Sequence, residues 1–271
     1  MGIGNIFHIL LINPIFNILL VFIFVFSTWA LPGALGWAII ALTSMFRIAF
    51  SPLYKKQMHM ATQMEVMRPK LEALQKKYKG DPKKIQQEQL KLYQEHGINP
   101  ASGCLLAIIQ IPLVIALYQV LLSVFQGNNL AHISELTKKT AYFEFLRITH
   151  IDPQFLGFNL GIAPSTFNQN GLYYLIIPVL TAFLQYLQLQ VATPSVKKTP
   201  DSDKELAKKD GKPGEKKEES FQEVFQKQSK FMFPLMVGYF SYILPVGLAL
   251  YWNVFSLFSI LQAKEKVWKK K

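Results

Sequence analysis

Residues 35–53 read LGWAIIALTSMFRIAFSPL, an apolar stretch that contains a single charged side chain, Arg47. Its length is close to the ~20 residues that a helix needs to cross a bilayer. On insertion scales, an arginine at the centre of such a helix costs about 2.5–3.5 kcal/mol of free energy. Arg47 is therefore by default a candidate functional residue. Because Tyr54 follows only about 10 Å further along a helix, snorkelling of the arginine to lipid headgroups is an equally good interpretation at this point.

Further apolar runs of similar length occur at 9–29, 104–125, 172–191, 231–244 and 246–262. The chain is 51% hydrophobic yet carries a net charge of +12, so its apolar and basic stretches are separated along the sequence. Buried helices of a soluble protein would each keep a polar face, and these runs have none. The predicted fold class is therefore an all-α polytopic membrane protein.

The distribution of lysine and arginine predicts the topology, because short basic loops stay on the cytoplasmic side. Segments 54–98 and 192–230 each carry 10 basic residues and 263–271 carries 5, whereas 127–171 carries only 3. The segment 127–171 is thus expected outside and the other three inside. This arrangement requires five spans and a cytoplasmic C-terminus, with the spans at 34–53, 101–126, 172–191, 230–245 and 246–263.

The N-terminal segment 1–33 contains no lysine or arginine, so the charge rule does not place it. Pro14 and the Leu31-Pro32-Gly33 break predict an apolar helix over 15–31. It lacks the charged start and the cleavage site of a signal peptide, so we expect it to be retained. Two placements remain open, one in the outer interface and one as a sixth span.

The segment 54–100 is predicted to be a cytoplasmic helical hairpin. Gly80-Asp81-Pro82 separates two stretches of helix formers, with Asp81 as the cap of the second helix and Gly97 as its end. Apolar residues recur at spacings of three and four in the first helix, at Met60, Met64, Met67, Leu71 and Leu74; those of the second, Ile85, Leu90 and Tyr93, are less regular. These stripes are expected to pack on each other.

The same methionines suit a second role. Methionine is flexible and polarisable, so Met58, Met60, Met64 and Met67 also form a candidate surface for receiving diverse apolar substrate segments.

The segment 192–229 has the composition of a flexible charged loop. The basic tail 264–271 is interpreted as a topology anchor in preference to a binding site for anionic lipids or ribosomal RNA.

Signs of enzymatic chemistry are missing from the sequence. There is one cysteine, Cys104, and the histidines show no metal-ligand spacing, so neither a metal nor a cofactor is expected. No aspartate or glutamate lies in the five spans, and no phosphate-binding loop or nucleophile motif is present. The spans do contain polar residues for which interhelical hydrogen bonding is the simplest interpretation, namely Thr43, Ser44, Gln110, Gln119, Gln185, Gln188, Ser241, Asn253, Ser256 and Ser259.

Several blocks of the sequence resemble the YidC membrane protein insertase family and its mitochondrial Oxa and chloroplast Alb relatives. They are TSMFRIAFSPL at 43–53, MRPK at 67–70 with KKY at 76–78, LYQEHGINP at 92–100, GCLLAIIQIP at 103–112 with ALY at 116–118, and LPVGLALYW at 244–252. Their order along the chain matches the predicted topology, and the resemblance covers nearly the whole chain.

The resemblance implies five core helices around a hydrophilic groove that is open to the cytoplasm and to lipid. Groove positions of the family match Arg47, Thr43, Gln110 and Trp252, although relatives often have tyrosine in place of Trp252. It further implies an inner-membrane insertase whose partners are nascent membrane proteins, the ribosome, membrane lipids and, in some settings, the Sec translocon, with no specific DNA binding. Two other functions stay open: a small-solute transporter or channel, and a membrane assembly factor without a groove, in which Arg47 snorkels.

Overall fold

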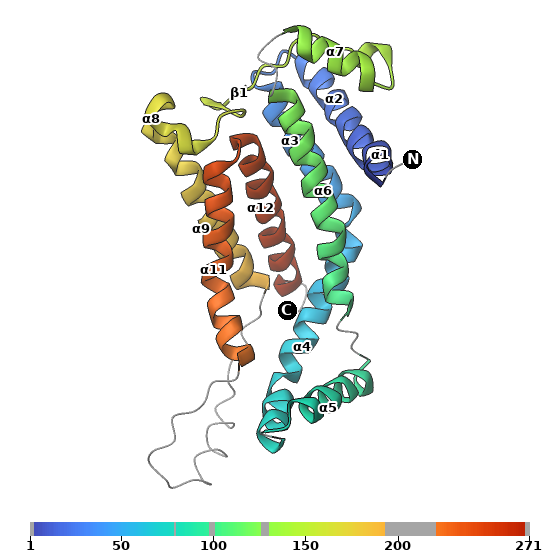
Figure 1. Ribbon diagram of the computed structural model, residues 1–271, viewed down its shortest axis with the longest axis vertical. Helices are drawn as coiled ribbons and strands as arrows, with labels where there is room; N and C mark the ends of the chain where they lie inside the picture. Colours follow the sequence, from blue (N-terminus) through green and yellow to red (C-terminus); the bar gives the residue numbers. More distant parts are fainter. Residues whose placement is uncertain (1–2, 79, 98–100, 126–129, 193–220, 269–271) are drawn as a thin grey trace.

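The computed structural model describes residues 3–78, 80–97, 101–125, 130–192 and 221–268. Apart from one short hairpin of strands, its elements are helices, and Figure 1 shows them arranged as an elongated bundle with a helical hairpin, α4 and α5, at one end. The predicted all-α fold class is confirmed.

A long apolar helix occupies each of the five regions predicted to span the membrane. These helices are α3 (Ala34–Ala49), α6 (Ala101–Phe125), α9 (Ile176–Ala192), α11 (Phe221–Ile243) and α12 (Val246–Trp268). Helix α12 packs on both α3 and α9, and α11 packs on α9 on the far side from α3. The C-terminal helix therefore joins the two halves of the bundle.

Within the described residues, some of these helices are candidate membrane spans by length and composition. Leu172–Val191 and Val246–Ala263 are long and apolar enough to span a membrane, and α3 qualifies together with the first part of α4 as one bent span. Helix α11 begins at Phe221, before the predicted start of its span at 230. Its polar first half contains helix formers and no break, so the helix extends out of the apolar region; residues 193–220 of the predicted loop lie outside the described residues.

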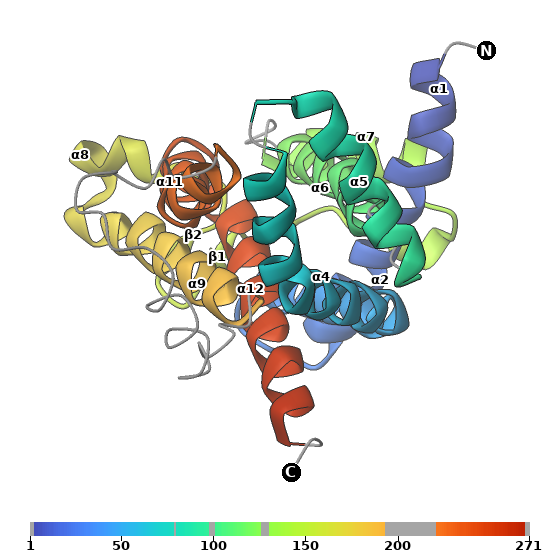
Figure 2. The ribbon, with the colours of Figure 1, turned by 90° about the horizontal axis from the view of Figure 1, so that it is seen from below.

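The N-terminal helix differs from its prediction, since Pro14 does not begin it. Helix α1 (Ile3–Phe7), a π-helical turn η1 (His8–Ile12) and α2 (Asn13–Thr28) follow one another without interruption. The backbone N–H of Asn13 bonds to the carbonyl of His8, and this wider turn accommodates the proline that follows. Asn5–Thr28 is long and apolar enough to span, and Figures 1 and 2 show it running obliquely to α6.

The predicted external segment forms a cap over one end of the bundle. It contains α7 (Leu130–Thr140), η2 (Glu144–Leu146), strands β1 (Gln154–Phe155) and β2 (Phe158–Asn159), η3 (Pro164–Thr166), α8 (Phe167–Asn170) and η4 (Leu172–Leu175). The two strands are antiparallel, and their turn has positive φ at Leu156 and Gly157. Positive φ at both central positions is characteristic of a tight type I′ hairpin.

Two contacts fix this cap to the bundle. The ring of Phe155 lies so close to α3 that a Cβ on Gly36 would be 2.1 Å from its Cγ, so only glycine fits there. The carbonyls of Leu160 and Ile162 accept hydrogen bonds of 2.8 and 3.0 Å from the backbone N–H groups of Gly247 and Val246. These bonds satisfy donors that the first turn of α12 leaves free.

The helical hairpin consists of α4 (Ser51–Lys77) and α5 (Pro82–Glu95). As predicted, the Asp81 side chain caps α5 by accepting a bond from the backbone N–H of Lys84 at 3.0 Å. The predicted packing of the two stripes is confirmed in part: Met67 and Tyr93 are buried at its centre, whereas Leu74 and Ile85 are not among the residues packed there. The prediction for Leu90 is wrong, because this side chain is exposed and Leu92 packs on the cluster instead.

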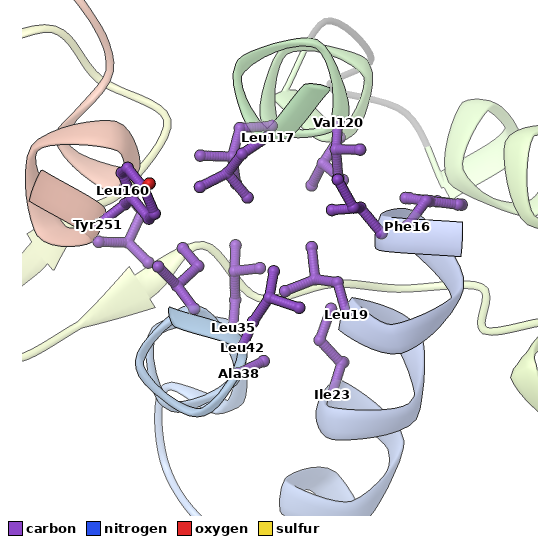
Figure 3. Close-up of a cluster of buried hydrophobic side chains, with 14 of the residues drawn as sticks. Phe16, Leu19, Ile23, Leu35, Ala38, Leu42, Leu117, Val120, Leu160 and Tyr251 are labelled. Atoms are coloured by element: carbon purple, nitrogen blue, oxygen red, sulfur yellow. The ribbon is translucent and has the colours of Figure 1, made fainter. Parts of the chain in front are cut away.

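The main apolar core lies between α2, α3, α6 and α12. Figure 3 shows its side chains pointing toward one another, among them Leu19 of α2, Leu42 of α3, Leu117 of α6 and Tyr251 of α12. Leu160 of the cap joins the same cluster. The core therefore ties the N-terminal helix, the cap and the C-terminal helix to the helix that carries Arg47.

Candidate functional site

Arg47 lies in the last turn of α3, next to a sharp bend in the chain. The axes of α3 and α4 differ by 59° across Phe50. Pro52 follows the bend, and because proline has no N–H and its ring clashes with the carbonyl four residues earlier, it kinks an otherwise continuous helix. The bend directs α4 away from the bundle while Arg47 stays at its inner surface.

The guanidinium of Arg47 is enclosed by aromatic rings. Its central carbon lies 4.1 Å from the ring centroid of Tyr54 and 4.2 Å from that of Phe255. Its Nη2 donates a hydrogen bond to the hydroxyl of Ser259, one helical turn beyond Phe255. Since only 2% of Arg47 is exposed, the side chain does not snorkel to the surface in this structure.

The charge of Arg47 has no counter-charge among the side chains that the structure describes. Among the residues that the structure describes, no aspartate or glutamate forms an ion pair with it, and its Nε has no hydrogen-bond partner. A buried cation is costly unless it is paired, and contacts with ring faces offset only part of that cost. Arg47 thus keeps the capacity to bind an anion.

Thr43 lies one turn before Arg47 and is fully buried. Its hydroxyl donates to the carbonyl of Ile39 at 2.7 Å, within the same helix. The side chain borders a narrow gap that is too small to hold a water molecule and is otherwise lined by Ile15, Leu42, Phe46, Leu113, Leu117 and Tyr251. Thr43 and Arg47 are therefore both enclosed by the side chains that the structure describes, and neither lines an open groove there.

Tyr251, not Trp252, faces Thr43 from the C-terminal helix. Tyr251 lines the same gap, and its ring lies 6.1 Å from that of Phe255, which in turn contacts Arg47. Trp252 is half-buried against the apolar cluster. Consecutive residues of a helix are turned by about 100°, so the two aromatic residues point to different neighbours.

A second polar region lies on the opposite face of α12, where it meets α9. The hydroxyl of Ser256 donates to Oε1 of Gln185 at 3.1 Å, and both side chains are buried. One turn to either side, Oδ1 of Asn253 and Oε1 of Gln188 are buried without a partner in the described part of the chain. A buried acceptor without a donor costs free energy, so this interface is less well satisfied than the apolar core.

The predicted interhelical hydrogen bonds are confirmed for only some of the polar residues. Ser256 bonds to another helix, and Ser259 bonds to both Arg47 and its own backbone. The hydroxyls of Thr43, Ser44 and Ser241 bond to backbone carbonyls of their own helices, as short hydroxyl side chains commonly do. The side chain of Gln110, near the start of α6, lies outside the described residues.

The arrangement of helices is similar to a solved membrane protein. A crystal structure of an active YidC insertase superimposes with a TM-score of 0.51 at 25% sequence identity, covering 88% of this chain and 44% of that one. A family model described as the 60Kd inner membrane protein matches residues 15–266. The chain belongs to the 60Kd inner membrane protein family. The resemblance to YidC, Oxa and Alb proteins is thereby confirmed.

Curated relatives of the 60Kd inner membrane protein family come from chloroplasts and bacteria. ALBINO3-like protein 1 of Arabidopsis thaliana is 33% identical over 252 residues, which are 90% of this chain and 45% of the relative. The membrane protein insertase YidC of Wolinella succinogenes is 31% identical over 230 residues, covering 85% of this chain and 33% of the relative. The chain thus spans half the length, or less, of these relatives.

Membership of the 60Kd inner membrane protein family agrees with the several long apolar helices of the structure. Together they make this chain a multi-pass protein of the inner membrane. The family is not known for enzymatic activity.

The sequence predicts Arg47 and Thr43 as site residues, but it does not predict the neighbours Tyr54, Phe255 and Tyr251. The spacing of 251, 255 and 259 along one face of α12 is the signal that could have indicated them.

Proposed function

We propose that this chain is a membrane protein insertase, which receives nascent membrane proteins from the cytoplasm and releases their apolar segments into the bilayer. The observation that carries the proposal is Arg47, a buried guanidinium at the inner end of an apolar helix with no acidic partner in the described residues. Relatives named as insertases, and the likeness to an insertase structure, support it.

In the proposed mechanism, Arg47 attracts acidic residues in the polar tail of a substrate. Pairing two opposite charges in a low-dielectric site is much stronger than in water, so the site lowers the cost of bringing that tail partway across. The adjoining apolar segment moves into lipid and gains about 25 cal/mol for each Å² that leaves water. This partition needs no ATP hydrolysis by the chain, and we infer that the chain is not an enzyme.

Substrate binding requires a movement, because the site is closed around Arg47. Its three neighbours belong to two elements, Tyr54 to α4 and Phe255 with Ser259 to α12. Separation of α12 from α4 would remove the Ser259 bond and one ring, and would open a hydrophilic groove toward the cytoplasm. A substrate carboxylate then takes the place of the Ser259 hydroxyl and can accept two parallel bonds from the guanidinium.

One-sided access favours an insertase over a channel. The external cap packs Phe155 against Gly36 and bonds to the first turn of α12 through Leu160 and Ile162, while the bend at Phe50 faces the other end of the bundle. A channel or transporter needs a path from both faces. No described feature favours that second function.

The hairpin of α4 and α5 is proposed as the first contact of the nascent chain. Met67 is buried against α5 and becomes available only when the hairpin opens or shifts, whereas Met60 and Met64 are partly exposed beside it. Methionine side chains adapt to varied apolar partners, which suits that role. We further propose that the chain works beside the ribosome and, for some substrates, the Sec translocon.

The proposal is tested by replacing Arg47 with alanine and with lysine in cells depleted of their own insertase. Insertion of substrates with acidic tails should fall at least about tenfold in the alanine variant, which corresponds to roughly 1.4 kcal/mol of lost attraction. Partial function of the lysine variant would indicate that charge matters more than guanidinium shape. Arg147→Ala, at an exposed arginine of the cap, is the matched control. Unchanged insertion in both Arg47 variants would exclude capture by this charge.

A further inference from the structure

Three aromatic side chains are exposed in a short stretch of the cap. Tyr142, Phe143 and Phe145 are each more than half exposed, at 56%, 58% and 54%. Leaving rings of this size in water forfeits a large hydrophobic gain, and clustered exposed apolar groups mark interaction surfaces. We call these three side chains the aromatic surface.

The aromatic surface is held firmly in place by the N-terminal helix. The Asn17 side chain donates to the carbonyl of Thr140 at 2.9 Å and accepts from the backbone N–H of Tyr142 at 2.7 Å. The ring of Phe145 meets that of Phe24 edge to face at 5.4 Å between centroids. Leu146, the next residue, is fully buried in the main core. The exposure is therefore built into the packing of the cap.

The helix that holds the aromatic surface itself needs an apolar environment. Asn5–Thr28 is apolar along its length, and well under half of it is buried inside the protein. The remainder must face lipid in a protein of the membrane. Phe24 is half-buried beside the exposed Val21, three residues earlier on the same helix, so the aromatic surface lies next to the side of the helix that is left uncovered.

We propose that the aromatic surface inserts into the outer interfacial region of the bilayer and anchors the cap there, with phospholipids as its binding partner. Tyrosine and phenylalanine suit this depth, since apolar rings lie among acyl chains while the tyrosine hydroxyl reaches the headgroups. Glu144 lies between two of the rings in sequence and pairs with Arg147 at 3.0 Å; both side chains are exposed, so charged groups suited to the headgroup region lie beside the rings. This anchoring is independent of the proposed insertase function.

The test measures the depth of a tryptophan placed in the aromatic surface. In a variant with Trp29, Trp37, Trp252 and Trp268 replaced by phenylalanine, Phe145→Trp is reconstituted into vesicles of phosphatidylcholine and phosphatidylglycerol. The lipids carry bromine atoms either near the headgroup or near the end of the acyl chain. Quenching by the shallow bromines should exceed quenching by the deep ones about twofold, as expected for an interfacial ring.

Two variants in the same background calibrate the measurement. Val179→Trp, at an exposed apolar position of α9, should be quenched by the deep bromines, and Gln169→Trp, at an exposed polar position of α8, should not be quenched. Tyr142→Trp supplies a second reporter that does not alter the contact with Phe24. If both reporters behave like Gln169→Trp, the surface lies in water and is reserved for a protein partner or a second copy, and lipid anchoring is wrong.

Discussion

Arg47 at the inner end of α3 donates a hydrogen bond to Ser259 in α12, a residue 212 positions later in the chain. This bond joins the first predicted span to the last at the place where the chain bends toward the helical hairpin of α4 and α5. The rings of Tyr54 and Phe255 complete the enclosure. The hydrogen bond and the two rings therefore enclose the only arginine in the five predicted spans.

Replacing Phe255 with leucine should loosen the enclosure of Arg47. The variant loses a cation–π contact worth about 0.5–2 kcal/mol, so the thermal stability in detergent should fall modestly. The guanidinium should also become accessible to phenylglyoxal, with modification of Arg47 measured by mass spectrometry relative to the exposed Arg147. Phe233→Leu, an exposed phenylalanine of α11, is the control. Equal modification of Arg47 in the two variants would show that the ring does not shield it.

Replacing Gly36 with alanine should disrupt the docking of the cap. The new methyl group would lie 2.1 Å from the ring of Phe155, so the ring and its strand must move. Overpacking of this kind typically costs about 1–3 kcal/mol of stability. Unfolding is followed for both single variants and for Gly36→Ala with Phe155→Ala. The loss of stability in the double variant should be smaller than the sum of the losses in the two single variants. A loss equal to that sum would argue against the contact.

Asn253→Leu should leave the stability of the bundle unchanged or raise it. The Oδ1 atom of Asn253 is buried without a partner in the described part of the chain, so removing it abolishes an unsatisfied acceptor. Gln185→Leu should instead destabilise by about 0.6–2 kcal/mol, because it breaks the bond with Ser256 inside the membrane. Thermal unfolding in one detergent compares the two. Equal destabilisation would mean that Asn253 contributes a polar contact of its own.

Glu88 should titrate at lower pH than an ordinary glutamate. The hydrogen bond from Lys91, at 2.9 Å, holds the pKa of Glu88 below its usual value and raises the pKa of Lys91. The stabilising effect of the pair on α5 is therefore present above the usual glutamate pKa and is lost as the pH falls through the lowered one.

An NMR titration of the Glu88 carboxyl checks this pH dependence. Lys91→Met should return the pKa of Glu88 toward its ordinary value, whereas Lys83→Met, at a neighbouring exposed lysine, should have little effect. High salt should weaken the shift, because Lys91 is exposed and Glu88 is partly exposed. A glutamate pKa that is unchanged in Lys91→Met would show that the pair does not persist in solution.

The sequence alone predicted the helical class, the regions of the five apolar helices, the hairpin with its Asp81 cap, and a charged side chain, Arg47, within an apolar helix. These features depend on local composition and spacing: a run of apolar residues near the length of a bilayer, a turn of glycine, aspartate and proline, and a charge in an apolar stretch. Nothing distant along the chain is needed to recognise them.

Only the tertiary structure decided which side chains surround Arg47 and whether the site is open. The family resemblance selected Trp252, but the rotation of α12 turns Tyr251 and Phe255 toward α3. The docking of Asn17 on the cap likewise depends on neighbours more than a hundred residues away. Helix rotation and docking follow from packing among all elements at once, and no local pattern encodes that.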